Sequence, residues 1–497
     1  ETPDADFADP DGLGDGTDWQ DLLFPGGSMY NAHVNISGGS EKTTYAMSLD
    51  YFDEKGVVPE TFWKRFSFRN NLDFELSKHI KIGTSLGITR DGGKGVSMNS
   101  DRPENNMMLA AIALDPTISP VRPYATIPDT LTLVPEDHEL YSSSDSLAWM
   151  NTPRGNTGNP LAQLYRNKTK YGMTWYDKIL TNNYIQFKPL EWLTLKSIIG
   201  CDYSVANGWY YNPIFYIDAN DQNQRDQIGH NYNQWFSLNW ENTIEINKTF
   251  GKQHFSLLGG TTAFDWKSKN FGFYKQDLGG SINNEVPQNM LLSGTGQIDP
   301  NFNEGYNGFM YRRYSSVFGR FNYEYDDKYF LTATVRRDGS SRFGYLNKFG
   351  VFPGFSAGWK IHNESFFKNF QENNGLDFIS FLKIRGGYGQ LGNSEPAGDF
   401  AYNGITSINS SNVIFGPDGT TNQIQGSTID FAPNPSLRWE TIGMSNFALD
   451  AGFFNNKLWL TAEYFIKKTS DMIMDDNTIL TAHGIGGAAR ANIGDME

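Results

Sequence analysis

Apolar and polar residues alternate along most of this chain, and the alternation is clearest in residues 329–338. There the odd-numbered positions from Tyr329 to Val335 are apolar, whereas most even-numbered positions, such as Thr332, are polar. Because successive side chains of a β-strand point to opposite faces, this pattern predicts a strand with one apolar and one polar face. Only Asp326–Asp327 separates it from a preceding segment of the same kind, so the two segments are expected to form a hairpin.

The same alternation predicts about fourteen strands, several of them longer than strands of soluble proteins usually are. They are expected at residues 29–39, 43–54, 62–77, 79–90, 173–188, 192–204, 230–247, 252–267, 310–325, 329–338, 350–361, 381–389, 440–453 and 457–468.

The links between the predicted strands alternate in length. Tight turns join one set of pairs, and long links at 91–172, 205–229, 268–309 and 390–439 join most of the others. Short turns on one rim and long loops on the other are typical of a transmembrane antiparallel β-barrel, with the short turns periplasmic and the long loops extracellular. The expected fold class is therefore all-β, with barrel strands across residues 29–468.

The two ends of the chain are expected to lie in outer loops. Residues 1–28 are rich in aspartate and predict an extracellular acidic loop, and residues 469–497 are expected to be a truncated outer loop. The chain begins at Glu1, without a Met or an apolar signal segment, which indicates a processed product or an excerpt of a longer protein.

Composition supports the barrel over two alternatives. Aromatic residues make up 15% of the chain, yet its mean hydropathy is −0.50, and the longest apolar run, Met107–Leu114, is too short for a membrane-spanning helix. A soluble β-sandwich would also show amphipathic strands. Aromatic residues near predicted strand ends, such as Trp192, Phe250 and Trp359, favour the barrel, because they are placed as aromatic girdles are.

Charge and candidate chemistry narrow the function. A net charge of −15 with scattered basic residues argues against nucleic-acid binding. Cys201 is the single cysteine and cannot form an internal disulfide. No arrangement of a nucleophile, a base and an oxyanion hole is visible, so we expect no enzyme activity and no cofactor.

Two segments are candidate binding sites. Asp9, Asp11 and Asp15 have carboxylates that could hold a structural Ca²⁺, although they lack the spacing of an EF-hand, and a solvated acidic loop is the alternative. An aromatic run followed by a carboxylate suits sugar rings; a rim girdle or a contact with a partner protein is the alternative. Its residues are Trp209, Tyr210, Tyr211, Phe215, Tyr216 and Asp218.

Several motifs resemble the SusC/RagA family of TonB-linked outer-membrane transporters, and they occur in the family's order. They are TDWQD at residues 17–21, SGGSEKTTY at 37–45, VRRDGSSRFG at 335–344, FP and SAGW at 352–359, LKIR and GYGQLGN at 382–393, and NPSLRWET at 434–441.

The resemblance implies a barrel of about 22 strands in the outer membrane of a Gram-negative bacterium of the Bacteroidota. It also implies an N-terminal plug, a SusD-like surface lipoprotein as a lid, and energy from the TonB complex. The plug, the N-terminal segment through which TonB would act, and the last strands are expected to be absent from this chain.

A helix is expected at residues 103–114, and its Met-rich face would pack on the barrel wall or the lid.

The function predicted in this way is active import of a nutrient, an oligosaccharide or an oligopeptide. Contacts with outer-membrane lipid follow from the expected fold. A passive porin and a soluble β-rich adhesin or structural surface protein are the alternatives.

Overall fold

The structure is a computed structural model. It describes residues 15–59, 61–95, 106–117, 121–123, 147–149, 160, 173–212, 215–216, 222–223, 227–276, 308–403, 405–415, 422–476 and 487–497.

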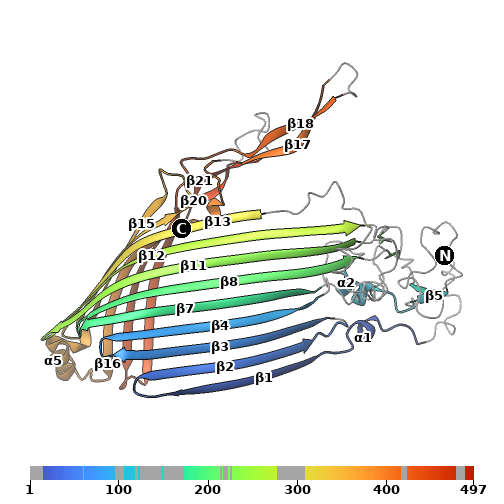
Figure 1. Cartoon of the computed structure of the whole chain (residues 1–497). Helices are drawn as coiled ribbons and strands as arrows, with labels where there is room; N and C mark the ends of the chain where they lie inside the picture. The colour runs from blue at the N-terminus through green and yellow to red at the C-terminus, as the bar shows by residue number, and fades with distance from the viewer. Residues whose placement is uncertain are drawn as a thin grey trace, which may run out of the picture.

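Fifteen antiparallel strands form one curved sheet, in which each strand pairs with the next of these strands along the chain (Figure 1). The strands are β1 (Ser28–Gly39), β2 (Thr43–Lys55), β3 (Phe62–Ser77), β4 (Ile80–Lys94), β7 (Thr174–Leu190), β8 (Leu193–Asn212), β11 (Gln227–Phe250), β12 (Gln253–Gln276), β13 (Gly308–Tyr325), β14 (Tyr329–Ser340), β15 (Phe349–Lys360), β16 (Ile379–Asn393), β19 (Glu440–Phe453), β20 (Leu458–Asp476) and β21 (Ala489–Met496).

The all-β prediction is confirmed, and each of the fourteen predicted strands has a counterpart in the sheet. The fifteenth strand, β21, corrects the expectation that residues 469–497 form only a loop, because β21 pairs with the end of β20. The pairing shifts register between Thr469 and Ile473, and β21 has only eight residues. Its alternation, with Ala489, Ala491 and Ile493 against Arg490 and Asn492, spans only five residues and is too short to mark a strand in the sequence.

Several strands continue into segments that were expected to be long loops. β8 runs to Asn212, β12 runs to Gln276, and β11 begins at Gln227. In these extensions aromatic residues are adjacent, as Tyr210 and Tyr211 are in β8 and Phe273 and Tyr274 are in β12, so strict alternation no longer separates strand from loop.

The sheet has a tight-turn end and a loop end, which lie at opposite ends of the strands (Figure 1). Three links depart from the expected pattern. At the loop end, short connections join β2 to β3 at residues 56–61 and β14 to β15 at residues 341–348. At the tight-turn end, residues 361–378 join β15 to β16 through η6 (Ile361–Asn363) and the helix α5 (Ser365–Asn374).

The two faces of the sheet differ as the alternation predicts. Leu331, Val335 and Phe355 project from the apolar face, and Phe355 remains 59% exposed. Within the described part of the chain the other sheets are two-stranded hairpins. No second large sheet in that part covers the apolar face, as a soluble sandwich would require.

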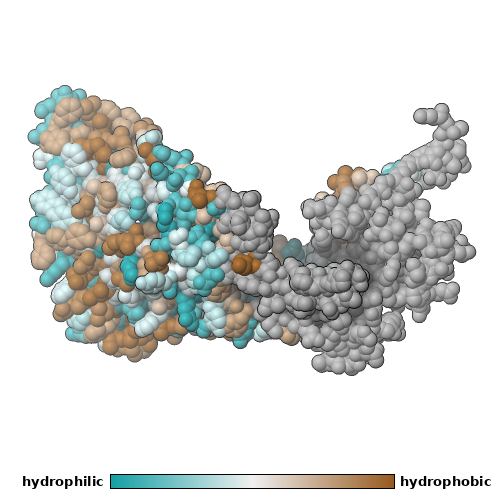
Figure 2. Space-filling model, turned by 90° about the horizontal axis from the view of Figure 1, so that it is seen from above, coloured by the Kyte–Doolittle hydropathy of each residue, from teal (hydrophilic) through white to brown (hydrophobic). Residues whose placement is uncertain are grey.

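Ion pairs on the apolar side mark where the apolar band stops. Arg90 lies 3.6 Å from Asp177, and Arg313 lies 3.1 Å from Asp265. All four residues lie on the same face of their strands as the apolar residues, but nearer the loop end. In Figure 2 a strip dominated by hydrophilic residues likewise separates the more hydrophobic part of this surface from the opposite end.

Two short helices pack together at the loop end. α1 (Trp19–Leu23) is capped by the Asp18 carboxylate, and α2 (Met107–Ala113) is capped by the Asn106 side chain. Their buried residues form two small clusters, which include Leu23 with Met107 and Trp19 with Ala110. The expected helix is therefore present, but in the described residues its buried face packs mainly on α1.

Shorter elements complete the described structure. They are the hairpins β5 (Val121–Pro123) with β6 (Leu147–Trp149), β9 (Phe215–Tyr216) with β10 (Gln222–Asn223) and β17 (Ile405–Phe415) with β18 (Asn422–Phe431), and the 3-10 turn η7 (Glu395–Ala397). None of the helices described is both long and apolar enough to cross a membrane.

A compact core lies at the loop end between β15 and β20, and we call it the loop-end core. Its ring contacts include Phe343 with Trp439 and Phe352 with Trp439, at centroid distances of 5.1 and 5.6 Å. Its buried residues are Phe343, Phe352, Ala397, Ala401, Leu437, Trp439 and Ile473.

Candidate functional site: the polar face of the sheet

The polar face carries charged side chains that pair across neighbouring strands. Lys178 on β7 lies 2.9 Å from Asp202 on β8. Arg385 on β16 lies 3.0 Å from Asp450 on β19 and 3.3 Å from Glu463 on β20. Such pairs contribute little stability each when they are exposed to water. Their placement shows that this face is built to contact water or polar groups.

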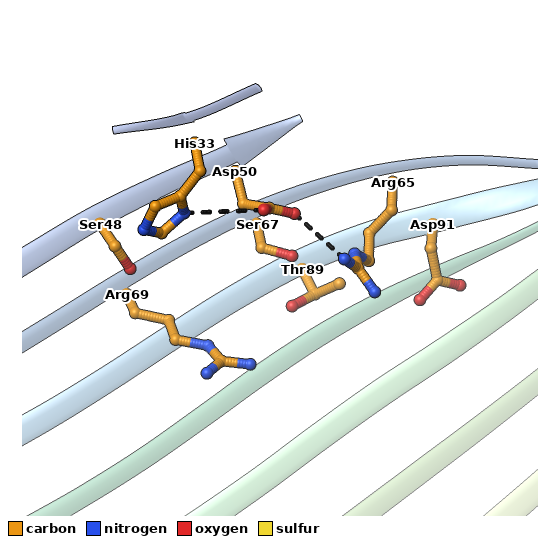
Figure 3. Close-up of a pocket in the computed structure, with 8 residues that line it drawn as sticks. All are labelled: His33, Ser48, Asp50, Arg65, Ser67, Arg69, Thr89 and Asp91. Carbon is orange, nitrogen blue, oxygen red and sulfur yellow. Dashed lines mark hydrogen bonds and ion pairs between the residues drawn. The ribbon is translucent and has the colours of Figure 1, made fainter. Parts of the chain in front are cut away.

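Polar side chains from β1 to β4 line a hollow of about 370 Å³ on this face (Figure 3). At its centre Asp50 pairs with Arg65 at 3.1 Å and with His33 at 3.7 Å. Arg69 and Asp91 also line the hollow and have no dashed contact among the residues drawn in Figure 3. The site can therefore offer both a guanidinium donor and a carboxylate acceptor to a polar ligand.

A second hollow, of about 410 Å³, lies over the glycine-rich wall formed by β15 and β16. A Cβ atom at Gly387 would lie 3.0 Å from the side chain of Ser356, and one at Gly358 would lie 3.2 Å from that of Lys383. Because these two positions have no side chain, the surface of β15 and β16 leaves room for the hollow. The Lys383 ammonium lies 5.2 Å from the centre of the Phe330 ring, beside the hollow.

A buried ion-pair network joins the polar face to the loop-end core. Arg312 binds both carboxylate oxygens of Asp399, with contacts of 2.8 to 3.1 Å. Arg342, whose side chain is only 3% exposed, lies 2.8 Å from Glu395 and 3.5 Å from Asp399. The Arg342 guanidinium also donates to the carbonyl oxygens of Ser394 and Glu395. The network fixes the segment after β16 against the start of β13.

Sequence reasoning did not find this network, although three of its four residues lie in or near the motifs that suggested a family. Arg342 belongs to the motif at residues 335–344, and Glu395 and Asp399 lie two and six residues after the motif at 382–393. A charged residue next to the buried Phe343 was the available signal. Its partner, more than fifty residues away in the sequence, could not be read from spacing.

The predicted aromatic run does not form one surface. Trp209 lies on the apolar side, where its ring stacks on His230 at 4.1 Å. Tyr210 points to the polar face, where its ring occupies the space that a Cβ at Gly229 would need. Tyr211, Phe215 and Tyr216 belong to β8 and β9, but their side chains lie outside the described residues, as does all of Asp218.

The calcium hypothesis remains a prediction. Asp9 and Asp11 lie outside the described residues, and Asp15 is exposed. In the described residues no group of three or more His, Cys, Asp or Glu side chains is arranged to hold a metal ion.

A curved antiparallel sheet with long strands, an uncovered apolar face and a polar opposite face is the wall of a transmembrane β-barrel of the outer-membrane type. Residues 126–496 match the family described as TonB dependent receptor-like, beta-barrel. The chain therefore belongs to this family, whose place is the outer membrane. The polar face is the luminal face of the barrel, and the apolar face is the lipid-facing one.

Curated relatives agree with this assignment. The chain is 30% identical to TonB-dependent receptor P26 of Formosa agariphila over 473 residues, which cover 92% of this chain and 41% of the relative. It is 27% identical to TonB-dependent receptor SusC of Bacteroides thetaiotaomicron over 500 residues, which cover 97% of this chain and 45% of SusC. The chain thus spans less than half the length of these relatives.

Among solved structures, the RagAB peptide transporter has the same fold. The match has a TM-score of 0.76 at 22% identity and covers 97% of this chain and 48% of the RagAB chain. The RagAB peptide importer in its open-open state matches with a TM-score of 0.77 and the same coverage. The expected SusC/RagA type of TonB-dependent barrel is therefore confirmed.

Proposed function

We propose that this barrel wall serves active import of a nutrient, an oligopeptide or an oligosaccharide, across the outer membrane. The observation that carries the proposal is the match of residues 126–496, most of the described wall, to the TonB-dependent receptor barrel. The similarity to SusC and to a structure described as a peptide transporter adds support. Energy would come from the TonB complex.

A SusD-like surface lipoprotein is the proposed lid, by analogy with the RagAB assembly. The loop end is the side on which such a lid would sit, because long loops of outer-membrane barrels face outward. The many donors and acceptors on the luminal face suit cargo that carries amides or hydroxyls. They do not distinguish a peptide from a glycan.

The test is uptake by cells that carry the full-length protein. Labelled oligopeptides and oligosaccharides are supplied to the parent strain, to a strain lacking the gene, and to the parent with TonB depleted. We expect one cargo class to accumulate only when both the protein and TonB are present. Uptake that continues without TonB, together with a steady single-channel conductance of the purified protein, would instead identify a passive porin.

Tyr210 is the member of the aromatic run that we propose as a cargo contact, because its side chain is on the luminal face. Tyr210→Ala in the full-length protein is expected to weaken cargo binding. Trp209→Ala is the matched control and should leave affinity unchanged, since Trp209 stacks on His230 on the other face. Equal affinities for both variants and the parent would remove Tyr210 from the binding site.

Calcium binding by the segment with Asp9, Asp11 and Asp15 is proposed only as a structural role in an outer loop. Titration of the full-length protein with Ca²⁺, compared with a variant carrying Asn at these three positions, tests it. Identical heats for the two proteins would remove the site.

A further inference from the structure

The helix α5 is the departure from the barrel pattern with the clearest functional consequence. Other described links at the tight-turn end are turns of two to four residues, such as 40–42 and 191–192, whereas the β15–β16 link contains a ten-residue helix. Figure 1 shows α5 projecting at this end, beside the first residues of β16. A helix is not needed to join two adjacent antiparallel strands.

The start of α5 is fixed to the lipid-facing side of the wall. Glu364, directly before the helix, accepts hydrogen bonds from the Tyr329 hydroxyl at 2.6 Å and the Trp359 indole at 3.2 Å, and it pairs with Lys328 at 3.1 Å. Tyr329 and Trp359 are apolar-face residues of β14 and β15, and their rings stack at 6.2 Å. With its side chain only 11% exposed, Glu364 ties the helix to this face.

The end of α5 is fixed as well. Gln371 donates from its amide to the carbonyl oxygens of Leu376 and Ile379, at 3.3 and 2.6 Å. Gly375 ends the helix in the left-handed conformation with φ of 65°, which glycine adopts without strain. Because both ends are held, the direction in which the helix presents its side chains is set.

One exposed side of α5 is aromatic. Phe366 and Phe370 are four residues apart, so they lie on one side of the helix, and they are 57% and 53% exposed. Lys368 and Glu372 fall on the opposite side and are also exposed. The helix is therefore amphipathic, with an uncovered aromatic stripe.

This stripe continues the lipid-facing surface. The Phe366 ring lies 6.2 Å from that of Trp359, which itself stacks on Tyr329. On the same rim, the exposed ring of Phe378 lies 5.7 Å from that of Phe454 in the β19–β20 turn. The rim between β14 and β20 thus carries two groups of aromatic rings, one around Trp359 and Phe366 and one around Phe378 and Phe454.

We propose that α5 is an interfacial helix that lies in the headgroup region of the periplasmic leaflet, with Phe366 and Phe370 inserted among the lipids. Lipid is the expected partner of the stripe, because the stripe extends a surface that already faces hydrocarbon. Aromatic rings prefer the membrane–water interface, and an amphipathic helix lies in its plane. The polar side with Lys368 and Glu372 then faces water.

The test uses the full-length protein in lipid nanodiscs, with Cys201 and any other native cysteine replaced by serine. Single cysteines introduced by Phe366→Cys, Phe370→Cys and Glu372→Cys are labelled with an environment-sensitive fluorophore. Val335→Cys serves as the reference for the hydrocarbon region. Lipids that carry a quencher near the headgroup or deep in the acyl chain, and iodide in the water, then report the depth of each label.

We expect labels at positions 366 and 370 to be quenched best by the shallow lipid quencher and poorly by iodide. The label at 372 should be quenched by iodide, and the label at 335 by the deep lipid quencher. Iodide quenching at 366 and 370 equal to that at 372 would overturn the proposal in favour of a periplasmic surface. Protection from iodide and from both lipid quenchers would overturn it in favour of a protein partner. None of these outcomes depends on whether the protein imports cargo.

Discussion

The lipid-facing wall and the loop-end core hold aromatic residues in opposite ways. On the wall, Phe355 projects from β15 with no protein cover, and lipid completes its burial. In the loop-end core, Phe343 is 1% exposed and packs on Trp439. Phenylalanine is therefore covered by lipid on the wall and by neighbouring side chains in the loop-end core.

Charges differ between the two regions in the same way. The pair of Asp50 with Arg65 lies on an open face, where water screens it. Arg342 is buried, and it depends on Glu395, Asp399 and two carbonyl oxygens for its charge. The luminal face of the wall should therefore tolerate substitutions of its charged residues. The loop-end core should tolerate substitution neither of its aromatic residues nor of its charged residues.

Replacing Phe343 by Ala tests this contrast most strongly. The substitution removes a fully buried ring and is expected to cost about 3–5 kcal/mol of local stability. Phe355→Ala is the matched control, since lipid fills the space that it leaves. Limited proteolysis of the full-length protein at the loop end should be faster for Phe343→Ala only. Equal proteolysis of both variants would contradict the contrast.

A charge on each face of one strand is the next test. Val335→Arg places a guanidinium toward the hydrocarbon and is expected to destabilise the folded barrel by about 2–4 kcal/mol if position 335 lies near the bilayer midplane. Thr334→Arg, one residue earlier, faces the lumen and should change stability far less. Denaturant titration in lipid vesicles measures both. Similar losses would mean that the two faces are wrongly assigned.

Glu364 holds the start of α5 against the lipid-facing wall, and this attachment is sensitive to pH because Glu364 can be protonated. Hydrogen bonds from Tyr329, and then from Lys328 and Trp359, lower the pKa of Glu364 below its ordinary value. The anchor is thus fully present above about pH 4.3, the ordinary pKa of a glutamate, and is lost as the pH falls through the lowered pKa.

The expected result is that a fluorophore on Phe370→Cys changes its quenching below about pH 4.3. Glu364→Gln is the control, because the glutamine cannot titrate and should remove the pH dependence. A pH response that persists in Glu364→Gln would assign it to another group.

The smallest effect is expected from the luminal ion pairs. Asp50→Asn breaks the pair with Arg65 and should cost about 0–1 kcal/mol in denaturant titration. A loss comparable to that of Phe343→Ala would show that the luminal pair is as tightly coupled as the loop-end core.

Most of the wall could be predicted because each strand is determined by the alternation of its own residues. A strand between lipid and water must alternate at every second residue, as Leu331 and Thr332 do, and a single sequence records that alternation. The prediction was wrong where this rule no longer acts. β21 alternates over only five residues, and the extensions of β8 and β12 have adjacent aromatic residues, such as Phe273 and Tyr274, in place of strict alternation.

The loop-end core and α5 depend on contacts between distant residues. Arg342 meets Glu395 and Asp399 across more than fifty residues, so no spacing rule reveals the network. The helix α5 follows a glutamate that bonds to a tyrosine 35 residues earlier. Gly375 was a visible local signal for the end of a helix, but the helix was not predicted.

The strands β11 and β12 are 24 residues long, whereas a tilted strand needs about 9–11 residues to cross the hydrocarbon. At about 3.3 Å per residue and a tilt near 45°, such a strand rises roughly 55 Å, about twice the height of the apolar band. These strands therefore extend well beyond the lipid surface on the loop side, whereas β14 and β15, with 12 residues each, are about as tall as the apolar band. With the function proposed above, cargo would first meet the protein on this taller part of the wall.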